Sequence, residues 1–103
     1  MSEYFLAYHG GKMPESPEEG AKVMQKWTVW IEKSGSAMVN PGSPVGMSKT
    51  VTPKGVTNDG GSNPISGYSI VKADSIEAAI EIASGCPHLE YDGTIEVAEL
   101  MQM

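Results

Sequence analysis

Arginine is absent from this chain of 103 residues, and its seven cations face thirteen Asp and Glu, for a formal net charge of −6. Because arginine makes the bidentate contacts with phosphate, and an acidic chain repels a polyanion, we expect no nucleic-acid partner. Anionic membrane surfaces are disfavoured for the same reason. No run approaches the roughly 20 apolar residues that span a bilayer. The N-terminus shows no basic secretion-signal segment, so we also expect no membrane partner.

Cysteine is nearly absent as well, because Cys86 is the single one. An internal disulfide is therefore excluded, and a reducing compartment, the cytoplasm, is expected. Hydrophobic residues make up 40% of the chain and charged residues 19%, which is ordinary for a globular protein. The length predicts a single domain over residues 1–103.

The first half of the chain predicts a strand, a helix and a second strand. Residues 4–8 are almost wholly apolar and too few for a helix, so we expect a strand buried on both faces. Ser16 and Glu19 form a capping box, in which Glu19 reaches back to the Ser16 amide, and Gly35 ends the helix. Trp27 lies at the centre of the predicted apolar stripe and Trp30 at its edge. The other stripe residues are Val23, Met24 and Ile31, whereas Lys22, Lys26 and Lys33 fall largely off it.

The second half repeats this pattern after an irregular middle. Residues 37–40 predict a strand, and residues 45–52 alternate again as a continuation or a separate strand. Residues 53–66 are rich in Gly, Pro, Asn and Ser and predict a long flexible loop or an irregular hairpin. A strand over 68–73, a helix that starts after Ser75 and ends at Gly85, and a strand over 94–100 complete the order. The second helix is expected to pack through Ile76, Ala79, Ile80 and Ala83.

The order β-α-β-β-α-β predicts an α+β, ferredoxin-like split-βαβ fold. Right-handed crossovers then give a four-stranded antiparallel sheet with both helices on one face. The other face has no cover within one chain. Because exposed apolar area costs roughly 25 cal/mol per Å², we expect a homodimer that closes sheet against sheet.

Several short motifs occur in a characteristic order along nearly the whole chain. The most specific are Gly67-Tyr68, Cys86-Pro87 and residues 93–97; the run 4–10, Gly35, Asp59-Gly60 and Glu77-Ala78 accompany them. In these motifs the chain resembles the YCII-related family, and within it the branch named for an Asp-Gly-Pro-Phe (DGPF) motif. The resemblance implies a single YCII-related domain that forms a dimeric α+β barrel.

The chain also departs from that family at motif positions. Gly61-Ser62 follows Asp59-Gly60 in place of Pro-Phe, and Ala98 stands where relatives often carry Arg. Relatives near the name-giver have a histidine in the first helix, suspected of pairing with an aspartate, but this helix has none, so the dyad is not carried over. By analogy with related folds, the resemblance implies a small cofactor-free enzyme acting on a small molecule. A non-catalytic small-molecule-binding or assembly module is the alternative.

Two titratable residues are candidates for acid–base chemistry. His9 ends the first strand and is either a catalytic acid or base or a turn histidine bonded to backbone. Glu96 shares a strand face with Ala98 and Leu100. It is either a general base on a partly apolar surface or a solvated partner of Lys72.

Three further residues complete the predicted pocket. Tyr68 is expected to donate a hydrogen bond to substrate, with Tyr8 lining the same cavity, and Asp59 is an optional orienting carboxylate on the loop. We expect the loop before Tyr68 to enter at the sheet edge opposite His9. Asp59 would then reach His9 only by folding back or from the partner chain.

Metal chemistry is not predicted. His9, Cys86 and His88 supply three ligands only if the fold joins them, and a zinc site needs three or four. Cys86 follows a helix C-terminus, where the helix dipole disfavours a thiolate. We therefore expect a small buried hydrophobe there, and neither a metal nor another cofactor.

Overall fold

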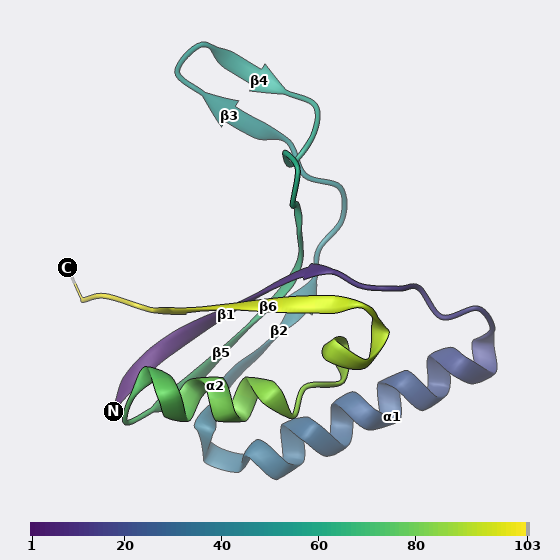
Figure 1. The fold of residues 1–103 in the computed structure, drawn as a ribbon, viewed down its shortest axis with the longest axis vertical. Coiled ribbons are helices and arrows are strands. Elements are labelled where there is room, and N and C mark those ends of the chain that lie inside the picture. Colours follow the sequence, from purple (N-terminus) through teal and green to yellow (C-terminus); the bar gives the residue numbers. More distant parts are fainter. Residues whose placement is uncertain (103) are drawn as a thin grey trace.

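In a computed structural model, which describes residues 1–102, two helices cover one face of a four-stranded antiparallel sheet (Figure 1). The strand order is β2-β5-β1-β6. The strands of this sheet are β1 (Ser2–Gly10), β2 (Met38–Pro44), β5 (Ile65–Ala73) and β6 (Gly93–Glu99). The helices are α1 (Pro17–Ser34) and α2 (Ile76–Ser84), with short 3-10 helices η1 (Gly35–Ala37) and η2 (Pro87–Tyr91). The predicted α+β, ferredoxin-like arrangement is confirmed.

The helix starts follow from their capping residues. The Ser16 hydroxyl accepts a hydrogen bond from the Glu19 amide at 3.1 Å, and Pro17 fills the first helical position. The Glu19 carboxylate accepts from the Glu15 amide at 3.3 Å, one residue earlier than the capping box predicts. Ser75 caps α2 in the same way, through the Ala78 amide at 3.2 Å. Neither α1 nor α2 is both long and apolar enough to cross a bilayer.

The core lies between the sheet and the helices. Alternate residues of β1 and β5 point into it, and small residues of α2 let that helix approach closely. The buried members are Tyr4, Leu6, Tyr8, Trp30, Val71, Ala73, Ala79, Ala83 and Cys86. Ile76 and Ile80 are half exposed, so the expected stripe of α2 is wrong at both isoleucines and correct at both alanines.

On α1 the buried face is rotated from the predicted one. Trp30 is only 6% exposed, whereas Trp27 packs against the rim of the core and Met24 is 67% exposed. The indole Nε1 of Trp30 donates to the carbonyl oxygen of Ile82 at 3.0 Å. This bond satisfies the one polar atom of the indole and lets Trp30 be the buried tryptophan.

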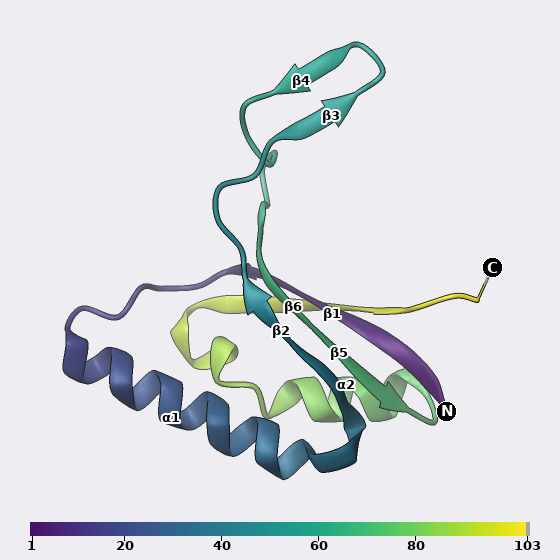
Figure 2. The ribbon, with the colours of Figure 1, turned by 180° about the vertical axis from the view of Figure 1, so that it is seen from behind.

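The middle of the chain, residues 45–64, forms an arm that projects from the sheet on the side away from the helices (Figures 1 and 2). It carries a hairpin of β3 (Thr50–Thr52) and β4 (Gly55–Thr57). Of the two alternatives for residues 53–66, the structure shows the hairpin, whose first strand begins before that range. Val51 and Val56 are 79% and 60% exposed, so the arm has no core of its own.

Candidate functional site

Three of the predicted site residues meet on the face of the large sheet that no helix covers, hereafter the open face. Ala7 in β1 pairs with Tyr68 in β5 on one side and with Glu96 in β6 on the other. His9 follows two residues after Ala7, so its side chain points to the same face. Phe5 stacks on Tyr68 with ring centroids 5.8 Å apart. The small side chain of Ala7 therefore lies among His9, Tyr68 and Glu96.

Both ring nitrogens of His9 face hydrogen-bond acceptors. Nε2 lies 3.1 Å from Oε1 of Glu96, and Nδ1 lies 3.0 Å and 3.3 Å from the carbonyl oxygens of Asn63 and Pro64. A neutral imidazole carries one N–H and satisfies only one of these directions. A hydrogen on Nε2 bonds Glu96, and a hydrogen on Nδ1 bonds the carbonyls of the arm.

Glu96 is the accessible member of this pair. Its side chain is 69% exposed, against 13% for His9. The His9 contact uses Oε1, and within residues 1–102 no hydrogen bond or ion pair engages Oε2. A carboxylate held at one oxygen and open at the other can take a proton from a bound molecule.

Tyr8 lies on the opposite side of the sheet from Tyr68. Its hydroxyl donates to the Ser69 hydroxyl at 2.6 Å, and Ser69 donates to the carbonyl oxygen of Pro41 at 2.7 Å. Burial raises the pKa of the Tyr8 phenol far above its usual value. Tyr8 thus ties β1 to β5 and β2 within the core, and one pocket cannot hold both tyrosines as predicted.

Asp59 shapes a turn at the base of the arm. Its Oδ1 accepts from the Gly61 amide at 3.0 Å, and its carbonyl oxygen accepts from the Thr50 hydroxyl at 2.7 Å. The arm reaches His9 through the backbone of Asn63 and Pro64 instead. Backbone carbonyls carry no residue-type signal, so the sequence could not identify them.

The expected position of the loop relative to His9 is wrong. β1 and β5 are antiparallel, with Ser2 opposite Ala73 and His9 opposite Ile65. β1 starts the first βαβ unit and β5 starts the second. The strands of the two units interleave in the sheet and run in opposite directions. The segment before β5 therefore enters beside His9, without help from a partner chain.

Cys86, His88 and His9 do not form a common site. Nε2 of His88 donates to the backbone carbonyl of His9 at 2.9 Å, and its ring packs 5.2 Å from that of Tyr8 on the helix side. Burial raises the pKa of the Cys86 thiol to about 11, which keeps it protonated at neutral pH. Within residues 1–102, no three His, Cys, Asp or Glu side chains are grouped to hold a metal ion.

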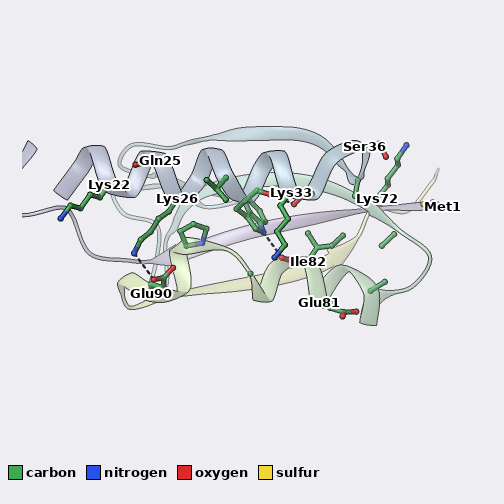
Figure 3. A pocket seen from close by; sticks show the side chains of 18 residues that line it. Met1, Lys22, Gln25, Lys26, Lys33, Ser36, Lys72, Glu81, Ile82 and Glu90 are labelled. Carbon is green, nitrogen blue, oxygen red and sulfur yellow. Dashed lines mark hydrogen bonds and ion pairs between the residues drawn. The ribbon is translucent and has the colours of Figure 1, made fainter. Parts of the chain in front are cut away.

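A hollow with a volume of about 950 Å³ lies elsewhere, between α1 and α2 (Figure 3). No predicted site residue lines it. Lys22, Lys26 and Lys33 line it. Their position off the predicted apolar stripe was the sequence signal that could have pointed to this hollow.

Comparisons with protein-family models and with curated proteins gave no match for this chain. The function is therefore argued from the site itself.

Proposed function

We propose that the protein is a small cofactor-free enzyme of the YCII-related type, which acts on a small molecule as a homodimer closed over the open face. The observation that carries this proposal is the grouping of His9, Tyr68 and Glu96 around Ala7. The motif resemblance along the chain supports the same family and the dimeric α+β barrel.

In this proposal the three side chains have distinct roles. Glu96 is the general base, because Oε2 is open to a bound molecule. His9 is a positioning residue: its ring nitrogens are occupied by Glu96 and by the arm, and it holds the carboxylate in place. The Tyr68 hydroxyl is a hydrogen-bond donor to substrate.

A second copy on the open face would complete such a site. Phe5, Ile70 and Ala98 share this face with the group, and apolar area left in water is costly. Covering the face removes water from the His9–Glu96 pair and strengthens electrostatic interactions there.

A non-catalytic binding or assembly module is the second candidate. The observation that favours it is that both nitrogens of His9 are taken by acceptors of the protein itself. A histidine with both nitrogens engaged can simply tie β1, β6 and the arm together.

A metabolite-pool thermal-shift screen followed by turnover assays tests the proposal. A ligand at 100 times its Kd stabilises by about 2.7 kcal/mol. We expect at least one stabilising ligand to be converted, and Glu96→Gln to lower its turnover by roughly 10²–10⁴-fold.

Glu99→Gln is the matched control, because Glu99 lies on the same strand but outside the group. Binding without conversion supports the second candidate. An equal loss of turnover in Glu99→Gln, or no stabilising ligand, contradicts the proposed site.

A further inference from the structure

The groove between α1 and α2 lies on the helix side of the sheet, away from the open face. Its volume of about 950 Å³ is at the upper end of small-molecule pockets, which are roughly 300–1,000 Å³. The two helices make few direct contacts, so the space between them is not filled by interlocking side chains.

The floor of this groove is apolar. Val29 and Trp30 of α1 form it together with Ile82 of α2 and Pro87 of η2. Trp30 is mostly buried and already donates its Nε1 hydrogen to Ile82, so the small exposed part of the indole offers carbon atoms and no free donor. Val29 is 56% exposed. Such a floor favours an apolar chain over a polar ligand.

The rim carries more cations than anions, four lysines against Glu81 and Glu90, although the chain as a whole has a net charge of −6. Four of the seven lysines line the groove: Lys22, Lys26, Lys33 and Lys72. Lys26 extends toward Glu90 of η2 and Lys33 toward Ile82 of α2, whereas Lys22 extends outward at the other end of the groove (Figure 3). Within residues 1–102, Lys26 pairs with Glu90 at 3.2 Å, whereas Lys22 and Lys33 form no ion pair.

We propose that this groove binds a single-chain anionic amphiphile, a free long-chain carboxylate. Its chain lies on Val29, Trp30 and Ile82, and its carboxylate is met by Lys22 or Lys33. The eleven steps along α1 from Lys22 to Lys33 span roughly 16 Å at about 1.5 Å per residue, which suits an extended chain. This site shares no residue with the proposed sheet-face site and does not depend on it.

The direct test is a titration of the full chain with dodecanoate below its micelle concentration, followed by tryptophan fluorescence and calorimetry. We expect saturable binding of one ligand per chain, weakened by added salt because lysines meet the carboxylate. Dodecanol lacks the charge and hexanoate lacks the length, so both should bind at least about tenfold more weakly.

Charge-removing variants localise the binding. Lys22→Gln with Lys33→Gln should raise the dodecanoate Kd about tenfold. Lys49→Gln with Lys54→Gln makes the same change of charge on the arm and should leave the Kd unchanged. Equal effects of the two pairs would show that only the net charge matters and would overturn the proposal.

A substitution on the floor of the groove distinguishes binding in the groove from binding to other apolar surfaces. Val29→Asp should abolish binding, whereas Val51→Asp on the exposed arm should not, with thermal melts confirming that both fold. Glu96→Gln should bind normally, which keeps this test distinct from that of the enzyme. Three results would contradict a carboxylate site. The chain could bind only phosphatidylglycerol vesicles, or it could bind dodecanol as tightly as dodecanoate. Val29→Asp could also abolish self-association, which would make the groove an interface between two copies.

Discussion

Hydrogen bonding decides which tryptophan anchors α1. Helical spacing alone places Trp27 at the centre of the apolar stripe and Trp30 at its edge, which is the reverse of their burial. The carbonyl of Ile82 near the end of α2, which also accepts from the Gly85 amide at 3.2 Å, gives Trp30 a partner for its N–H, and Trp30 is the buried one. This pairing links residues 52 positions apart, so local periodicity could not reveal it.

Trp30→Ala should therefore lower the free energy of unfolding by about 3–5 kcal/mol, the usual cost for a buried aromatic residue. Trp27→Ala should cost clearly less, because Trp27 lies at the rim of the core. Urea melts of the two variants measure both values. Equal costs, or a larger cost at Trp27, would show that the buried face of α1 has been misassigned.

Gly93 is required by the ring of His88. A β-carbon at residue 93 would overlap the His88 ring atoms Nε2, Cδ2 and Cε1, which are held by the bond to the His9 carbonyl. Gly93→Ala should cost about 1–3 kcal/mol of stability through overpacking. Gly46→Ala is the control, since nothing lies within 4 Å of that position.

Combining Gly93→Ala with His88→Ala should recover part of this loss in a double-mutant cycle. Strictly additive costs would mean that the His88 ring does not occupy the space beside Gly93.

The buried thiol makes stability fall at alkaline pH. The pKa of Cys86 is about 11 in the folded chain against 9.0 for a solvent-exposed thiol, because burial disfavours the thiolate. Since the folded-state pKa is raised, the contribution of the protonated thiol to folding stability is fully present below pH 9.0. It is lost as the pH rises toward about 11.

Denaturation curves between these pH values should show a steeper loss of stability for the native chain than for Cys86→Ala. The raised pKa of the Tyr8 phenol also lowers stability at high pH, but it does so in both the native chain and Cys86→Ala. Identical slopes would contradict a buried, protonated thiol.

At the scale of elements, local signals located most of the structure. Ser16, Ser75 and Gly35 mark helix ends through contacts within a few residues, and each end lies where the sequence predicted it. The arm was less predictable, because residues 45–52 alternate as a core strand would, yet Val51 faces solvent. Alternation reveals a strand but not whether anything covers it.

The tip of the arm should be dispensable for folding of the body. Thr50 pairs with Thr57, so residues 51–56 can be replaced by a two-residue Asn-Gly turn. All six are exposed, and the change in unfolding free energy should stay below about 1 kcal/mol. Urea melts check this; a loss of several kcal/mol would show that the tip packs on something in solution.

For the whole molecule, the candidate site was predictable only in part. Strand alternation placed Glu96 on one face with Ala98, and the register then brought His9 and Tyr68 beside it. Tyr8 and Asp59 fell elsewhere, because an aromatic residue in a strand fits either face and a loop carboxylate is readily used in its own turn.

The arm and the open face together predict a homodimer. The arm projects on the same side as the open face (Figure 2), so a second copy packed on that face would also meet the arm. Sedimentation at micromolar concentration should give twice 10.9 kDa. Ile70→Asp places a charge at the centre of the open face and should yield monomers, whereas Ile80→Asp, on the exposed side of α2, should stay dimeric. A folded native monomer, or dissociation by both variants alike, would contradict closure through the sheet.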